Sequence, residues 1–350
     1  MADGLASHPL AQLTLTRFRE VIREPEAVFW TFVFPLLLAA GLGVAFRSRP
    51  ADVVAVAVVA DAPAGDAVAA ALGAEPGLAV RKVDSAAAAR ALRTGEVALV
   101  VVPRGPDAAE YRFDDTRPEG RAARGLADAA LQRAAGRTDP VAATDAIVRE
   151  PGSRYIDFVM PGLLGLNLLG SGIWTVGFGI VSARQKKLLK RLVATPMSRA
   201  QYLASYLLSR LVFLAFEVAV LVGFGAIAFG VPVRGPLPVL AAICLLGAFA
   251  FSGLGLLVAA RPTTIEGASG LMNLVMLPMW VFSGVFFSSS RFPEAVQPLI
   301  QALPLTAVND ALRANLLRGA GFAEVAPELA ILAGWLVATF GLALRVFRWR

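Results

Sequence analysis

Side chains that could carry out catalysis or bind a metal are scarce in this sequence. It contains one histidine, His8, and one cysteine, Cys244. A histidine-based metal centre or a Ser-His-Asp triad is excluded, because His8 has no acidic or thiol cluster beside it. None of the lysines follows a glycine in the G-x-x-x-x-G-K-[ST] pattern that binds nucleotide phosphates. The chain is therefore not predicted to be an enzyme or to hold a cofactor.

A basic segment at residues 184–195 has the clearest pattern for binding a partner. At about 100° per residue, its lysines and arginines lie on one half of a helix and its leucines and valine on the other, and Pro196 ends the helix. Periodicity leaves two interpretations open: the helix lies on anionic lipid, or it docks into a groove on a cytoplasmic protein. The residues concerned are Arg184, Gln185, Lys186, Lys187, Leu188, Leu189, Lys190, Arg191, Leu192, Val193, Ala194 and Thr195.

Two ionisable residues interrupt one of the long apolar stretches. Arg210 and Glu217 lie two helical turns apart, and about 10 Å along one helix is expected to be too far for a tight pair. Ionisable groups at membrane depth are costly and usually face the protein interior or water. Two interpretations are open. In one, Arg210 extends to the cytoplasmic interface while Glu217 bonds a polar group on a neighbouring helix. In the other, Glu217 lies at a dimer interface or pathway wall.

Uncharged polar residues form two further stripes at helical spacing. Asn167, Ser171 and Thr175 follow one another at intervals of four, and Asn273 belongs to a similar, shorter stripe. Such residues either join helices by hydrogen bonds or line the pathway or dimer interface.

The composition indicates the kind of fold that holds these residues in place. Of 350 residues, 57% are hydrophobic and 17% are charged, and the mean hydropathy is +0.64. A soluble domain carries about 25% charged residues, so the sequence predicts an α-helical polytopic membrane protein. The net charge of +7 lies largely beside apolar runs, which indicates membrane topology and not nucleic-acid binding. About 20 apolar residues cross a bilayer, and six spans are predicted, at 28–46, 156–183, 201–230, 235–260, 267–288 and 327–345.

Charge in the short loops predicts the orientation. Most of their Lys and Arg lie on the side that holds both termini, which is therefore cytoplasmic. The leader, residues 1–27, is predicted to remain as a cytoplasmic amphipathic segment on lipid, and residues 346–350 form a tail. Residues 184–200 then form a cytoplasmic loop, and residues 289–326 form short outer helices that are either interfacial or re-entrant.

The long segment between the first two spans has a different pattern. Within residues 47–155, apolar runs at 52–60, 78–83 and 96–102 alternate with helical stretches, and a further helix is expected at 121–136. This alternation predicts a small α/β domain with a largely parallel sheet, located outside the cytoplasm.

Several segments, in order, resemble permease subunits of type-2 ATP-binding-cassette exporters. They are Leu188–Arg210 (LLKRLVATPMSRAQYLASYLLSR), Glu24–Pro35, Tyr155–Gly165 (YIDFVMPGLLG), Leu277–Phe287 and Leu303–Leu317. The family pattern often reads Glu-Arg-Glu-x-Gly-Thr before the leucine-rich part, and Arg184–Leu189 departs from it.

The resemblance implies a complex at the cell membrane. It would contain two six-span permeases, this chain and a second copy or a homologue, and two cytoplasmic ATPases that hold ATP and Mg. Residues 184–195 would be the coupling helix. The expected function is export of an amphiphilic substrate, such as a drug, a lipid or a glycan. Two alternatives are a membrane sensor without transport and a membrane-embedded enzyme.

Overall fold

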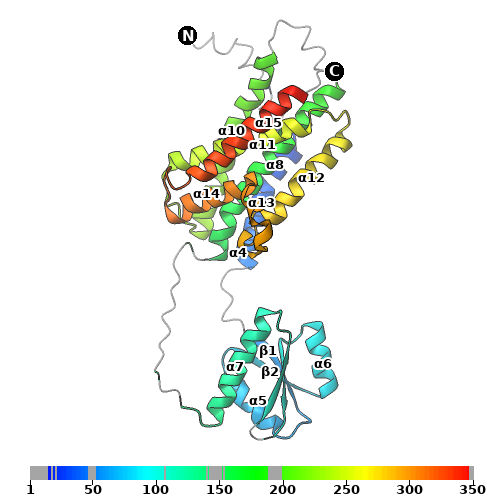
Figure 1. Ribbon diagram of the computed structural model, residues 1–350, viewed down its shortest axis with the longest axis vertical. Coiled ribbons are helices and arrows are strands. Elements are labelled where there is room, and N and C mark those ends of the chain that lie inside the picture. The colour runs from blue at the N-terminus through cyan, green and yellow to red at the C-terminus, as the bar shows by residue number, and fades with distance from the viewer. Residues whose placement is uncertain are drawn as a thin grey trace. The chain divides into compact units, whose positions relative to one another are not determined.

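The computed structural model describes residues 22–45, 53–105, 108–138, 154–187 and 199–346, together with single positions at 15, 16, 19, 141 and 152. In α10, the side chains are described from Arg210 onward. The chain divides into two compact units, residues 48–147 and the remainder (Figure 1). Most of the expected leader helix and residues 188–198 of the cytoplasmic loop lie outside the described residues.

The smaller unit is an α/β layer structure around a four-stranded sheet in the order β2-β1-β3-β4. The strands are β1 (Val54–Val59), β2 (Leu78–Val83), β3 (Leu99–Pro103) and β4 (Ala109–Phe113). β1 pairs in parallel with β2 and β3. Helices α5 (Gly65–Gly73) and α7 (Pro118–Ala134) cover one face, and α6 (Ser85–Thr94) covers the other (Figure 1).

The fourth strand was missed by the sequence analysis. β4 pairs antiparallel with β3 at the edge of the sheet, and its sequence AEYRF has no apolar run. Hydrogen bonds from Arg112 and Arg104 lower the pKa of its Glu110 to about 2. Charge on an exposed edge strand discourages pairing with other chains. The charged residues that made β4 hard to predict therefore fit its position at the edge of the sheet.

The larger unit is a bundle of apolar helices. Five helices of the described chain are long and apolar enough to cross a membrane. They are α8 (Tyr155–Gln185), α10 (Arg199–Phe229), α11 (Leu237–Val258), α12 (Ile265–Phe282) and α15 (Ala326–Val346). A shorter apolar helix, Phe29–Ala45, consists of the π-helical turn η1 (Phe29–Val33) and α4 (Phe34–Ala45), and α3 (Pro25–Val28) precedes it.

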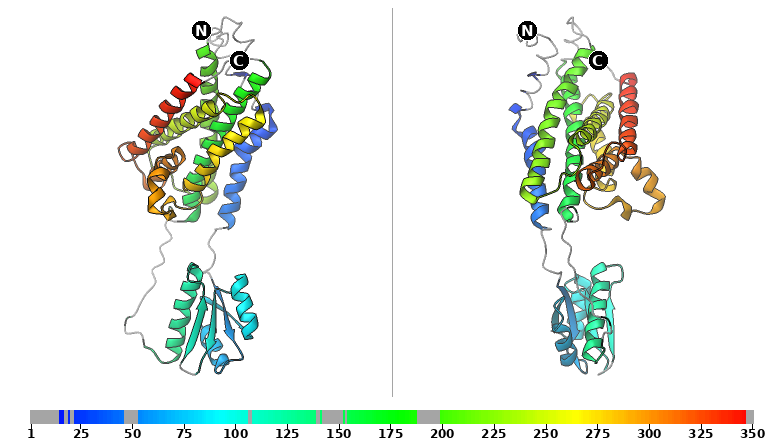
Figure 2. Two further views of the ribbon diagram at one scale, coloured as in Figure 1. Left: turned by 45° about the vertical axis from the view of Figure 1, so that its right-hand side comes forward. Right: turned by 90° about the vertical axis from the view of Figure 1, so that its left-hand side faces the viewer.

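Helix α11 lies at the centre of the bundle. It packs most extensively against α8 on one side and α15 on the other, an order visible in the right-hand view of Figure 2. Small residues allow the closest approach: a Cβ on Gly172 of α8 would lie 2.6 Å from Cβ of Phe251 in α11. Close backbone approach at glycines is the usual way in which membrane helices gain packing energy.

Helix α12 ends six residues before the predicted span does. The prediction followed the uncharged run to residue 288, whereas α12 ends at Phe282. Gly284 has φ +71°, the left-handed conformation that terminates helices at glycine. Side chains of α14 (Pro304–Arg318) bind the freed carbonyls, because Asn309 donates to Ser283 O at 2.8 Å and Arg313 donates to Gly284 O.

The segment between α12 and α15 folds against the bundle. It contains the short turns η2 (Ser289–Arg291) and η3 (Glu294–Val296), then α13 (Gln297–Gln301) and α14. Helix α14 packs against α8, α11 and α15, and most of its residues are buried. This burial makes α14 part of the helical unit, and whether it is interfacial or re-entrant stays a prediction.

Candidate functional site

The expected coupling segment is described only at its beginning. Arg184 and Gln185 form the last turn of α8, Lys186 is its C-cap, and Lys187 follows with φ +54°. Gln185, Lys186 and Lys187 are exposed. Leu188, Leu189, Lys190, Arg191, Leu192, Val193, Ala194 and Thr195 lie outside the described residues, so the helix predicted there stays a prediction.

Arg184 differs from its exposed neighbours. Its guanidinium donates to three carbonyl oxygens that follow α11: those of Ala259 at 3.0 Å, Pro262 at 2.5 Å and Ala260 at 3.2 Å. The last carbonyls of a helix have no partner within the helix and favour a cation. Arg184 therefore joins the end of α8 to the end of α11, a role that its place in a basic run did not reveal.

Replacing Arg184 by glutamine should lower the free energy of unfolding by about 1–2 kcal/mol, because a neutral amide cannot span three carbonyls. Denaturant titration in mixed micelles measures the loss. Lys186→Gln, at the next basic residue, which is exposed, is the matched control and should change stability by less than about 0.5 kcal/mol. Equal effects of the two substitutions would contradict the assigned role.

A buried charge cluster joins α8 to α10. Arg210 Nη1 donates to Glu217 Oε1 at 2.6 Å, and its Nη2 donates to Glu217 Oε2 at 3.1 Å and to Ser171 Oγ at 2.7 Å. The side chains of Arg210 and Glu217 are only 4% and 1% exposed. Ser171 Oγ also lies 2.6 Å from the carbonyl oxygen of Asn167, one turn earlier. Both oxygens of the Glu217 carboxylate thus accept hydrogen bonds from the two terminal nitrogens of the Arg210 guanidinium.

This pair corrects the expectation that Arg210 and Glu217 are too far apart. Two helical turns put them on one face at about 10 Å, but the long arginine side chain extends along the helix and covers that distance. The expected extension of Arg210 to an interface is also wrong, because its guanidinium is buried. The seven-residue spacing correctly placed Arg210 and Glu217 on one face of the helix, but the length of the arginine side chain was underestimated.

The cluster lies at the middle of α8. Ser171 is near the centre of this 31-residue helix, which at 1.5 Å per residue is about 46 Å long. Each half is then longer than half of an approximately 30 Å hydrocarbon core. A charge at that depth is tolerated when it is paired and faces the protein interior. The cluster can therefore hold α8 and α10 in register.

The other polar residues singled out in the sequence are divided by the structure. Asn167 is buried beside the cluster, whereas Thr175 of α8 and Asn273 of α12 are exposed. The stripe on α8 is therefore not one continuous site. Asn167 and Ser171 lie in the interior of the helical unit, whereas the side chain of Thr175 is exposed.

Arg313 is a partly buried cation whose role the sequence analysis missed. It donates to Phe158 O at 3.3 Å and to Gly284 O, and its guanidinium carbon lies 3.7 Å from the centre of the Phe158 ring. It thereby holds α14 against α8 and against the end of α12. The sequence analysis treated Arg313 only as part of the outer segment, residues 289–326. Its position on an amphipathic helix could have indicated that it contacts the bundle.

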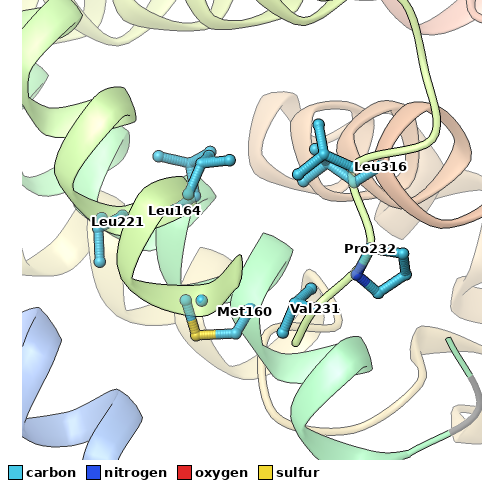
Figure 3. A pocket seen from close by; sticks show the side chains of 9 residues that line it. Met160, Leu164, Leu221, Val231, Pro232 and Leu316 are labelled. Atoms are coloured by element: carbon cyan, nitrogen blue, oxygen red, sulfur yellow. The ribbon is translucent and has the colours of Figure 1, made fainter. Parts of the chain in front are cut away.

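The described part of the helical unit contains a small gap and a larger groove. A gap of about 10 Å³ lies between α8, α10, α14 and residues 231–233, lined by Met160, Leu164, Leu221, Val231, Pro232 and Leu316 among others (Figure 3). It is about the size of one water probe and has apolar walls, so it is not a ligand site. A larger groove of about 490 Å³ lies between α8, α11 and α15. In the described part of the chain, no group of three or more His, Cys, Asp or Glu residues could hold a metal ion.

Comparison with known proteins identifies relatives over most of the chain. The family described as "ABC-2 family transporter protein" matches residues 26–345. The chain is similar to ABC transporter G family member 20 of Dictyostelium discoideum, with 25% identity over 57% of this chain and 28% of that protein. It is 27% identical to the inner membrane transport permease YhhJ of Escherichia coli over 52% of this chain and 49% of that one. It is also 27% identical to the daunorubicin resistance ABC transporter permease protein DrrB1 of Streptomyces coeruleorubidus, over 55% and 69% of the two chains. The first two matches cover less than half of the relatives' length.

Proposed function

Because this chain belongs to the ABC-2 family of transporter proteins, we propose that it is the pathway-forming permease of an exporter driven by a separate cytoplasmic ATPase. That it is a multi-pass membrane permease of an ABC transporter follows from the family and the apolar helices. Export, a cell-membrane location and cytoplasmic termini are part of the proposal. The observation that carries it is the family match across both the helical unit and the inserted α/β unit.

We assign ATPase coupling to the segment that joins α8 to α10. Arg184 fixes the end of α8 to the end of α11, so a force on the following segment would act on a braced helix. Exposed Lys186 and Lys187 begin the basic face. Since Arg184 is occupied internally, the contacts to the partner are assigned to Lys186, Lys187, Lys190 and Arg191.

The pathway is assigned to the space between two copies of the chain, with six spans in each when Phe29–Ala45 is included. Thr175 and Asn273 are exposed and remain available to a second copy, whereas Asn167, Ser171 and Glu217 are buried within one chain. The daunorubicin resistance named for one relative supports an amphiphilic substrate.

Co-purification tests the coupling assignment. The tagged chain, extracted in mild detergent, should recover an ATPase whose sequence contains a nucleotide-binding loop. Reversing the four basic residues should lower recovery about tenfold or more, because like charge would replace complementary charge across the interface. The variant combines Lys186→Glu, Lys187→Glu, Lys190→Glu and Arg191→Glu.

A matched control reverses four exposed arginines of the α/β unit, and it should leave recovery unchanged. The control combines Arg81→Glu, Arg90→Glu, Arg93→Glu and Arg121→Glu, all exposed in the structure. Recovery of no ATPase by the unaltered chain would contradict the exporter. Equal recovery by the unaltered chain and the coupling variant would contradict the docking segment.

A further inference from the structure

The groove between α8, α11 and α15 has walls of hydrocarbon. It has a volume of about 490 Å³, and its lining residues are apolar or small except for Ser252. The hydroxyl of Ser252 donates to the carbonyl of Ala248 at 2.7 Å, so it offers no unsatisfied donor. A pocket with these walls binds a ligand by burying apolar surface.

The groove is open on the outer surface of α15. Val337 in its wall is 72% exposed, and Gly341 is exposed as well. A Cβ built on Gly341 would meet nothing within 4 Å, so the missing side chain leaves real space. Because α15 is apolar and mostly exposed, that space faces the hydrocarbon of the bilayer.

One end of the groove is basic on all three helices. Arg184 follows Ile180 by one turn of α8, Arg345 follows Gly341 by one turn of α15, and Arg261 lies just beyond α11. Arg261 and Arg345 are exposed, and neither has an ion-pair partner among the residues that the structure describes. Exposed Lys186 lies at the same end of α8.

We propose that this groove binds an anionic phospholipid, with one acyl chain between α8, α11 and α15 and the phosphate at Arg261 and Arg345. Basic pockets between membrane helices bind acidic head groups, because each Lys or Arg near the surface attracts the lipid phosphate. The apolar groove matches the acyl chain of such a lipid, and the basic end matches its phosphate. The groove and the two arginines assigned to the phosphate lie outside residues 184–195, and the proposal goes beyond the proposed function.

Native mass spectrometry of the purified full chain tests the proposal, with phosphatidylglycerol and phosphatidylcholine of identical acyl chains as probes. The unaltered chain should retain one phosphatidylglycerol and prefer it to phosphatidylcholine by about tenfold. Gly341→Leu, which fills the groove, should reduce retention about tenfold or more. Gly334→Leu is the control, because Gly334 is also open on α15 but does not line the groove.

A second variant separates the head group from the acyl chain. The double substitution Arg261→Gln with Arg345→Gln should remove the preference for phosphatidylglycerol while retaining binding of both lipids. Unchanged retention by Gly341→Leu would overturn the groove assignment, and equal affinity of the unaltered chain for both lipids would overturn the head-group assignment. Loss of a dimer instead of a lipid in Gly341→Leu would show that a second copy occupies the groove. Recovery of the ATPase, measured in parallel, reports on the proposed function alone.

Discussion

Replacing Glu217 by glutamine is expected to destabilise the helical unit by about 3–5 kcal/mol, because it leaves a buried guanidinium without its counter-charge. Glutamine keeps the size of the side chain and one acceptor, so the loss measures charge and not a cavity. Arg210 is 4% exposed and cannot turn to water without leaving the bundle. Steric trapping or denaturant titration in mixed micelles measures the change in unfolding free energy.

Removing both charges should restore most of that stability. Arg210→Met combined with Glu217→Leu replaces the pair by apolar groups, which is often neutral or stabilising for a buried ion pair. A double-mutant cycle of Arg210→Met, Glu217→Leu and their combination should therefore show a coupling energy of about 2 kcal/mol or more. Glu266→Gln is the control, because Glu266 is exposed on α12 and should cost less than about 0.5 kcal/mol. A Glu217→Gln variant as stable as this control would exclude a tight pair.

The cluster also bears on coupling, because it binds the two helices that flank the proposed coupling segment. α8 ends at Gln185 and α10 begins at Arg199, so a displacement of the intervening residues pulls on both helices. The Arg210–Glu217 pair and Ser171 resist their sliding near mid-membrane. A displacement of that segment would then shift α8 and α10 together, as the proposed transmission of ATPase closure to the proposed pathway requires.

The long apolar helices were predictable from the sequence because their signal is local. An uncharged run of about 20 residues has little alternative to a membrane helix, and α11 and α15 lie within two residues of the predicted spans. In the α/β unit, β1 and β3 were found for the same reason, since both are buried apolar runs. Helices and strands that consist of one continuous apolar run were therefore predicted close to their observed bounds.

The features that the sequence analysis missed depend on distant partners. Arg184 belongs to a basic run, and only the nearby end of α11 shows that it is a cap. The early end of α12 depends on Asn309 and Arg313, which lie on another helix. Strand β4 was missed because an edge strand needs no apolar run. Of the candidate site, the shared face of Arg210 and Glu217 was predictable, whereas their bond to each other and to Ser171 was not.

Replacing Gly172 by alanine and Gly170 by alanine should change stability in opposite directions. Both glycines lie on α8, and in both alanine favours the helix by up to about 1 kcal/mol. A Cβ on Gly170 would meet nothing within 4 Å, whereas one on Gly172 would lie 2.6 Å from Cβ of Phe251. Gly170→Ala should therefore be neutral or stabilising, and Gly172→Ala should cost about 2–3 kcal/mol through overpacking.

The clash at Gly172 cannot be relieved by shortening its neighbour. The atom concerned is the Cβ of Phe251, which alanine retains, and backbone atoms of Phe251 and Ser252 lie 3.3 Å from the same point. Helix α8 would have to move away from α11, and Arg184 would lose its geometry at the end of α11. Adding Phe251→Ala to Gly172→Ala should therefore not rescue stability, as measured by the same titration. Rescue by that double variant, or equal stability of the two glycine variants, would show that the α8–α11 crossing is looser than the glycine contact requires.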